Sequence, residues 1–126
     1  MNYPENLKYT KDHEWILSEG NTATVGITDF AQRELGDIVY VEVGTVGKTL
    51  KANEVFGTVE AVKTVSDLYL PLDGKIEELN PNLEKKPELV NQDPYGEGWI
   101  IRISLMSGGD SAHLMDAASY EKLTGS

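Results

Sequence analysis

One lysine, Lys63, lies near the middle of a stretch rich in β-branched and aromatic residues, Val55 to Gly74. This composition predicts a β-hairpin with a tight tip, and Lys63 falls at that tip. An amine held at an exposed apex, clear of the body of the protein, is well placed to be acylated. Most exposed lysines are only solvated charges, and it is the setting between apolar residues on a hairpin tip that distinguishes Lys63.

The period of two along each strand gives this hairpin two unlike faces. If Lys63-Thr64 is the loop, Val62 faces Val65. One face is then apolar, with the cross-strand pairs Val55–Leu72, Gly57–Leu70 and Val59–Leu68. On the other face Glu60 opposes Asp67, a like-charge pair that costs about 0.2–1 kcal/mol. This pair either provides negative potential beside the tip or points into water at almost no cost.

Few other residues offer chemistry. The chain has no cysteine, which excludes disulfides and thiolate metal sites, and its two histidines are His13 and His113. A hydrolase that used His13 with Asp12 or Glu14 would also need a nucleophile or a metal, and the sequence offers no convincing constellation of that kind. The residues therefore do not favour the hydrolase interpretation.

Composition limits the partners. The 126 residues include 11 basic and 21 acidic side chains, for a net charge of −10, and their number predicts a single domain, 1–126. Such a surface repels phosphate backbones and anionic lipid, so we expect no nucleic-acid or membrane partner. It suits brief docking on basic clefts of larger proteins. No apolar stretch is long enough to span a bilayer, and the N-terminus resembles neither a signal peptide nor a transit sequence, which predicts a cytoplasmic, bacterial protein.

The elements that must position Lys63 are mostly short strands. Thr28 and Gly36 are suited to begin and end a short helix between them, and Asp116 and Gly125 are suited to flank a last helix, Ala117 to Leu123. Other expected elements are a hairpin from Trp15 to Ile27, strands Ile38 to Val43, Lys75 to Leu79 and Trp99 to Leu105, a helical turn after Pro87 and a break at Ser107 to Asp110. In Ile38 to Val43, the three valines Val39, Val41 and Val43 alternate onto one face. The fold class predicted is mainly β, an antiparallel β-sandwich or flattened barrel with short helices.

The stretch around Lys63 also carries a family resemblance. The run Phe56-Gly57-Thr58-Val59-Glu60-Ala61-Val62-Lys63, continued by Thr64-Val65-Ser66-Asp67-Leu68-Tyr69, resembles the lipoyl-attachment hairpin of the glycine cleavage system H protein family. Gly74, eleven residues after the lysine, also fits. Biotin carriers usually flank their lysine with methionines, and dehydrogenase lipoyl domains usually place an aspartate before it. The neighbours here are Val62 and Thr64.

The resemblance covers about Leu7 to Ile103 and extends to the C-terminal helix. Its other motifs are Tyr9 to Trp15, Ala23 to Gln32, Leu35 to Glu42, Pro87 to Asn91, Pro94 to Gly96 and Gly98-Trp99. Two positions depart from the family: Leu70 replaces its usual serine and Gly44-Thr45 its usual Pro-Glu. Leu70 falls on the inward face opposite Gly57, which indicates core filling, whereas Gly44-Thr45 changes a docking loop.

The resemblance implies a fold and a function. The fold is that of lipoyl domains, a barrel-sandwich hybrid, with the lipoyl hairpin at about 55–74 and a C-terminal helix at about 116–123. The function is that of a non-catalytic carrier with lipoate in amide linkage on Lys63. It accepts an aminomethyl group during glycine decarboxylation by P protein, passes it to T protein and is reoxidised by L protein. A lipoate-attaching enzyme is a further implied partner.

Four carboxylates are candidates beside the lysine. The family's arm-binding cleft implies Asp12 and Glu14, and the hairpin adds Asp67, so we expect a pocket in which these carboxylates keep an amine protonated. Glu60 belongs either to this pocket or to recognition by the modifying enzyme. The alternative is that Asp12 and Glu14 are solvated turn residues. We expect His13 and Trp15 to be structural, with Trp15 in the core or the cleft wall.

Two further interpretations remain open at the level of sequence. An H-like carrier could serve a lipoyl relay or a sulfur-oxidation pathway instead of glycine cleavage. The chain could also be an unmodified interaction domain in which Lys63 stays free.

Overall fold

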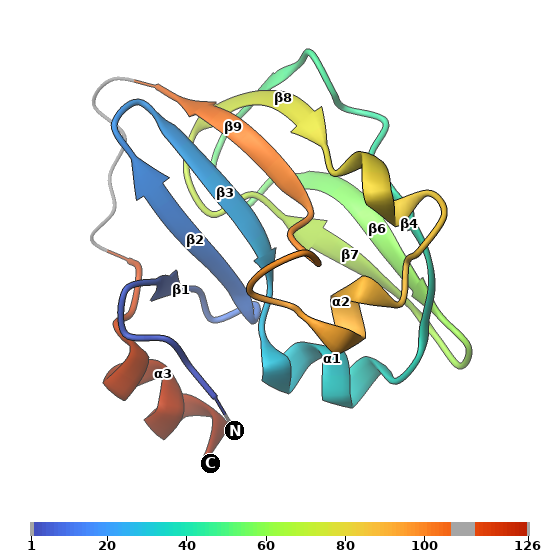
Figure 1. Cartoon of the computed structure of the whole chain (residues 1–126). Coiled ribbons are helices and arrows are strands. Elements are labelled where there is room, and N and C mark those ends of the chain that lie inside the picture. Colours follow the sequence, from blue (N-terminus) through green and yellow to red (C-terminus); the bar gives the residue numbers. More distant parts are fainter. Residues whose placement is uncertain (1, 107–112, 126) are drawn as a thin grey trace.

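The computed structural model describes residues 2–106 and 113–125, and the elements named below lie within these ranges. Two antiparallel sheets pack face to face, with short helices around them (Figure 1). The larger sheet has the order β1-β2-β3-β9-β8-β5. Its strands are β1 (Lys8–Tyr9), β2 (Glu14–Glu19), β3 (Thr22–Ile27), β9 (Ile101–Leu105), β8 (Gly74–Leu79) and β5 (Thr49–Leu50). This arrangement confirms the predicted mainly β sandwich.

The smaller sheet carries the lysine hairpin. It has the order β4-β6-β7, with β4 (Ile38–Glu42), β6 (Val55–Ala61) and β7 (Val65–Tyr69). Its inner face and that of the larger sheet share one apolar core, whose members include Val25, Val41, Val59, Leu68, Ile76 and Ile103. The hairpin is therefore fixed at its base by buried apolar side chains, while its tip projects from the body of the molecule (Figure 1).

Helices α1 (Asp29–Leu35) and α3 (Ala117–Thr124) are flanked by the residues that the sequence predicts, although α3 ends at Thr124 instead of Leu123. In α1 the Thr28 hydroxyl accepts from Ala31 N at 3.2 Å, and Gly36 follows at φ 80°. In α3 the Asp116 carboxylate accepts from Ser119 N at 2.8 Å. The turn expected after Pro87 is α2 (Leu89–Gln92), and a 3₁₀ helix, η1 (Pro81–Leu83), was not predicted. Figure 1 places α3 beside both chain termini.

The predicted strands are largely confirmed. The hairpin of Trp15 to Ile27 is β2–β3, and Lys75 to Leu79 is β8, whereas the last predicted strand begins at Ile101 instead of Trp99. The two-residue strands β1 and β5 were not predicted. The break expected at Ser107 to Asp110 lies outside the described residues. No described helix is long and apolar enough to span a bilayer.

The predicted alternation of the strand from Ile38 is wrong at its start. Ile38 is buried at 3% exposure and Val39 is 50% exposed, although Val41 and Val43 point inward as expected. The cause is a bulge between Ile38 and Tyr40, where one extra residue reverses the inside-outside order.

A second, smaller core consists of aromatic side chains at the end of the larger sheet. The rings of Tyr9 and Tyr120 stack at 4.8 Å with an interplanar angle of 11°. Trp15 is 2% exposed and its indole N–H donates to Pro94 O at 2.9 Å, which confirms that it is a core residue. This cluster fastens α3 to β1 and β2, and its remaining buried members are Tyr3, Leu7 and Ala117.

Candidate functional site

The tip of the β6–β7 hairpin is a two-residue turn formed by Val62 and Lys63. Ala61 N donates to Thr64 O at 2.8 Å, and Val62 N donates to Asp37 O at 3.1 Å. Lys63 is exposed and Val62 is 70% exposed. The predicted loop Lys63-Thr64 is therefore wrong by one position, yet the lysine still occupies the apex because either pairing places it there.

The changed loop shifts the cross-strand pairs from Gly57 to Glu60 by two residues. Glu60 opposes Val65, and Asp67 opposes Thr58, so the predicted Glu60–Asp67 pair does not form. A shift of two keeps each residue on its predicted face, because the side-chain period of a strand is two. Glu60 and Asp67 remain exposed on the outward face of the smaller sheet.

The start of β6 departs from the predicted pattern. A bulge between Val55 and Gly57 leaves Val55 43% exposed and buries Phe56 instead. Gly57 opposes Leu68 and not Leu70, and a Cβ at Gly57 would lie 2.4 Å from Glu42 O. Leu70 is fully buried, so its role in filling the core is confirmed although its predicted partner is wrong.

A groove runs from the hairpin tip along α1. One hollow of about 330 Å³ is lined by Arg33, Glu34, Leu35, Gly36, Asp37, Val62 and Lys63. A second hollow of about 260 Å³ is lined by Asp12, His13, Phe30, Ala31, Glu34, Leu35 and Ser66. Because both hollows share Glu34 and Leu35, we treat them as one feature and call it the α1 groove. It leads from the lysine to the turn that contains Asp12.

The far end of the α1 groove is shaped by a tight turn from Thr10 to Glu14. The Thr10 hydroxyl accepts from Asp12 N at 3.3 Å and from Glu14 N at 3.2 Å. His13 has φ 68°, and its N–H donates to Thr10 O at 3.1 Å. The turn places Asp12 and His13 on the groove wall and directs Glu14 into the protein.

Glu14 is a buried carboxyl, 2% exposed, between the two sheets. Its Oε2 accepts from Tyr69 N at 2.7 Å and its Oε1 from the Thr10 hydroxyl at 3.3 Å. Burial and, to a lesser extent, the charge of Asp12 raise the pKa of Glu14 to about 8, against the opposing hydrogen bonds from Tyr69 and Thr10. Glu14 is therefore mostly protonated at pH 7, and it is not the solvated turn residue of the alternative interpretation.

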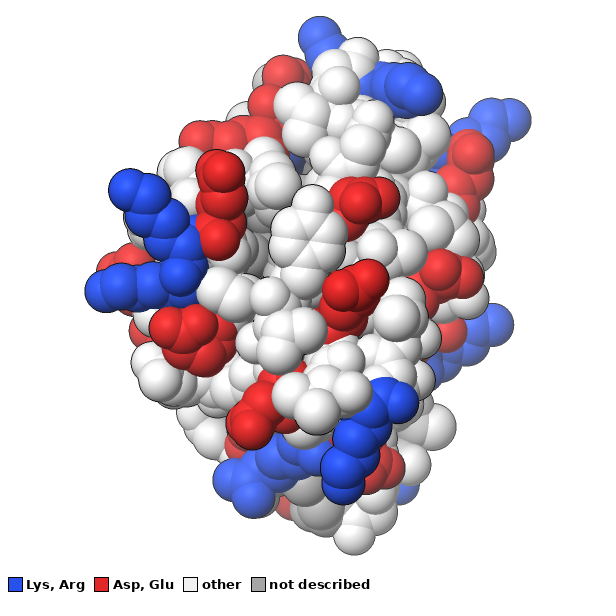
Figure 2. Space-filling model, turned by 90° about the vertical axis from the view of Figure 1, so that its right-hand side faces the viewer, with Lys and Arg blue, Asp and Glu red and all other residues white. Residues whose placement is uncertain are grey.

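The four predicted carboxylates divide between two places. Asp12 lines the α1 groove and Glu14 lies behind it, hydrogen-bonded to β7, whereas Glu60 and Asp67 lie on the outward face. Figure 2 shows the side of the molecule that carries β4: Asp and Glu spread over its centre, and most Lys and Arg lie toward its margins. An acidic surface therefore borders the hairpin.

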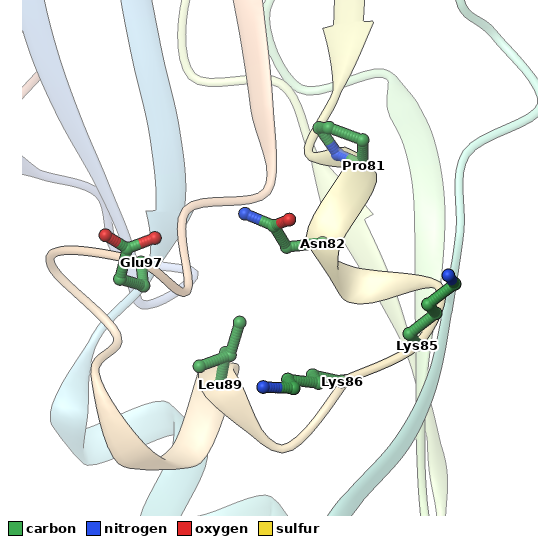
Figure 3. Close-up of a pocket in the computed structure, with 6 residues that line it drawn as sticks. All are labelled: Pro81, Asn82, Lys85, Lys86, Leu89 and Glu97. Atoms are coloured by element: carbon green, nitrogen blue, oxygen red, sulfur yellow. The ribbon is translucent and has the colours of Figure 1, made fainter.

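A larger hollow lies elsewhere on the molecule. It measures about 520 Å³ and is lined by Pro81, Asn82, Lys85, Lys86, Leu89 and Glu97 (Figure 3). Figure 3 shows the Lys85 ammonium directed away from Leu89. The lining includes no histidine and no hydroxyl nucleophile, and the described residues contain no cluster of three His, Asp or Glu that could hold a metal. Volume therefore does not identify the site in this protein.

Sequence reasoning did not find the α1 part of the groove. Phe30 and Glu34 both lie on α1, far in the sequence from Ser66 and Lys63, and no spacing links the helix to the hairpin. Only the packing of α1 against the hairpin brings them together. The prediction of a capped helix just before the strand from Ile38 was the nearest available signal.

Three comparisons bear on the whole chain. The family model described as glycine cleavage H-protein matches residues 7–126. The glycine cleavage system H protein of Bacteroides fragilis is 58% identical over 121 residues, 96% of each chain, and that of Symbiobacterium thermophilum is 58% identical over 123 residues, 98% of this chain and 96% of the relative. The crystal structure of the Mycobacterium marinum H protein covers 98% of this chain and all of its own, with a TM-score of 0.88 and 38% identity.

Proposed function

This chain belongs to the glycine cleavage H-protein family, and we propose that it carries its lipoyl group in amide linkage on Lys63. Members of the family are non-catalytic carriers with a lipoyl group on a lysine, and the chain is such a carrier in glycine catabolism. The open choice between glycine cleavage and another lipoyl pathway is thereby decided for glycine cleavage. We treat residues 1–126 as one carrier domain.

The observation that carries the assignment to Lys63 is the geometry of the hairpin tip. The lysine side chain is exposed, while the backbone on both sides is fixed by the Ala61–Thr64 pairing and by the bond from Val62 N to Asp37 O. A modifying enzyme can therefore reach the amine without unfolding the sheet. A long arm with a fixed root also visits several active sites at high effective concentration.

The residues around Lys63 fit a lipoyl arm. The α1 groove begins at Lys63, and its walls include the apolar side chains of Leu35, Phe30 and Ala31, which suit a hydrocarbon chain. At its far end stand Asp12 and Ser66, which suit a polar terminus. When bound, the lipoyl group would supply a disulfide that is reduced as it takes up a one-carbon unit and that L protein would have to re-oxidise.

Asp12 and Glu14 are proposed to favour the protonated form of an amine on the loaded arm. The negative charge of Asp12 stabilises an ammonium group beside it. An ammonium group near Glu14 lowers the pKa of that carboxyl, which then releases its proton. Glu14 would thus change from a neutral group in the empty groove to a carboxylate in the filled one. Such a coupled change lets a buried carboxyl stay uncharged until a cation arrives.

Membership of the glycine cleavage system makes P protein, T protein and L protein the partners of this carrier. We propose a lipoate-attaching enzyme as a further partner, and we assign Glu60 and Asp67, on the outward acidic face, to contacts with such proteins. Complementary charge on a partner raises the rate of encounter more than the final affinity. We expect no nucleic-acid or membrane partner, because a net charge of −10 repels other anions. A cytoplasmic location stays a prediction.

Intact-mass measurement on protein from lipoate-competent cells tests the assignment to Lys63. We expect the mass of one lipoyl amide on the unaltered chain and on Lys86→Ala, an exposed lysine on another side, and its loss in Lys63→Ala. A lipoyl mass that persists in Lys63→Ala would place the attachment elsewhere. No lipoyl mass in any of the three proteins would instead favour the interaction domain with a free lysine.

A further inference from the structure

The C-terminal helix contacts the α1 groove through one hydroxyl. Tyr120, on α3, is fully buried, and its hydroxyl lies 2.8 Å from Nδ1 of His13 and 2.7 Å from the Thr28 hydroxyl. His13 lines the α1 groove beside Asp12. A chain of three polar groups therefore runs from the N-terminus of α1, through α3, to the wall of the groove.

The hydrogen bonds around Tyr120 have a preferred direction. The Thr28 oxygen accepts from Ala31 N, so its own proton is available for the Tyr120 oxygen. Tyr120 then donates to Nδ1 of His13, and every group in the chain is satisfied. In the reverse direction the Thr28 proton has no acceptor among the described residues, and an unpaired buried donor is costly. The favoured arrangement leaves Nδ1 as an acceptor and places the imidazole proton on Nε2.

The imidazole is held in a single position and is neutral. The His13 N–H donates to Thr10 O, its carbonyl accepts from Thr28 N at 3.0 Å, and its ring lies 4.7 Å from that of Phe30. Burial lowers the pKa of His13, against the opposing charges of Asp12 and Glu34. Within the described chain Nε2 has no hydrogen-bond partner, so its N–H remains available on the groove side.

We propose that Tyr120 is a positioning residue for the α1 groove, and that it fixes His13 as the Nε2–H tautomer so that the groove wall offers a neutral donor. The class of group that this donor would take is a hydrogen-bond acceptor on the part of the arm that reaches the Asp12 end of the groove. This role rests on the proposed attachment of the arm at Lys63. The imidazole must also be neutral so that Asp12 stays available to a cation on the arm. A positively charged imidazolium would compete with that cation for the Asp12 carboxylate.

The first test is nitrogen-15 NMR of His13, which distinguishes the two tautomers and needs no lipoyl group. The unaltered protein is expected to give the signature of Nε2–H with an unprotonated Nδ1. Tyr120→Phe keeps the buried ring but removes the hydroxyl, and is expected to give a mixture of tautomers. Tyr9→Phe is the matched control: Tyr9 stacks on Tyr120 and donates to Pro4 O at 2.6 Å, so it also loses a buried hydroxyl.

The second test is the lifetime of the aminomethyl-loaded carrier at pH 7. Loss of one positioned hydrogen bond should shorten it by roughly three- to tenfold in Tyr120→Phe, with Tyr9→Phe within about twofold of the unaltered carrier. Equal lifetimes in the two variants would overturn the proposal. A protonated Nδ1 in the unaltered protein would also overturn it, even if Tyr120→Phe did not fold. Failure of the attachment at Lys63 would be seen separately, as a missing lipoyl mass.

Discussion

The hairpin tip and the turn from Thr10 to Trp15 hold their residues in opposite ways. At the tip the backbone is fixed and the side chains are free: Val62 is 70% exposed and Lys63 is exposed. In the turn the side chains themselves are fixed, with Glu14 and Trp15 each 2% exposed and hydrogen-bonded. A carrier needs both a fixed backbone and fixed side chains. The arm must be attached at a fixed exposed point, and it must return to a preformed groove.

The two regions also differ in how they carry charge. The carboxylates near the tip, Glu60 and Asp67, are exposed to water, whereas Glu14 is buried and its pKa is raised to about 8. Exposed charges act on partners at a distance and add little to folding. A buried carboxyl affects the stability of the fold itself. Four predictions test this contrast.

The largest effect is expected at Lys63. Lys63→Arg keeps the positive charge but removes the acylable amine, so lipoate attachment should be lost completely. The free energy of unfolding should change by less than about 0.5 kcal/mol, because the side chain is exposed. Mass spectrometry and urea denaturation measure the two quantities on the same sample. A large loss of stability would show that the tip is more than a point of attachment.

The next effect is the pH dependence caused by Glu14. Its pKa is raised from 4.5 to about 8 by folding, so the folded state binds the extra proton between these values. The free energy of unfolding should therefore fall as pH rises, by on the order of 1 kcal/mol per pH unit between about pH 5 and pH 8. Glu14→Gln should remove this slope. Denaturation curves at pH 5, 6.5 and 8 compare the two proteins, and parallel slopes would contradict the buried ionisation.

A smaller loss of stability is expected at the base of the hairpin. Gly57→Ala places a Cβ 2.4 Å from Glu42 O, where the backbone of β4 must move, at a cost of about 2–3 kcal/mol. Gly44→Ala is the matched control because no atom lies within 4 Å of its Cβ position. Urea denaturation measures both. Equal stabilities would mean that β4 and β6 are not closely packed at this point.

The smallest effect on folding is expected on the outward face. Glu60→Gln and Asp67→Asn should each change the free energy of unfolding by less than about 0.5 kcal/mol. If the acidic face guides partners, the rate of lipoate attachment should fall by roughly two- to tenfold at low salt and by less at high salt. Initial rates with purified attaching enzyme measure this. Rates unaffected at low salt would remove these two residues from the proposed contacts.

Local signals accounted for most of the elements. Thr28, Gly36, Asp116 and Gly125 mark the ends of α1 and α3 because caps depend on a few neighbouring residues. The errors came at the start of two strands, where one extra residue changes which side chains point inward. The bulges at Ile38–Tyr40 and Val55–Gly57 reverse the inside-outside order, and no residue type at those positions predicts them.

By itself the sequence determined the hairpin, the position of Lys63 at its apex and the family, since these depend on short contiguous runs of residues. Only the tertiary structure decided which groups surround the arm: it buried Glu14, left Glu60 and Asp67 outside, and brought Tyr120 to His13 across 107 positions of chain. The reason is physical. A pKa or a groove wall is set by desolvation and by neighbours in space, and these are known only when the sheets and helices are packed.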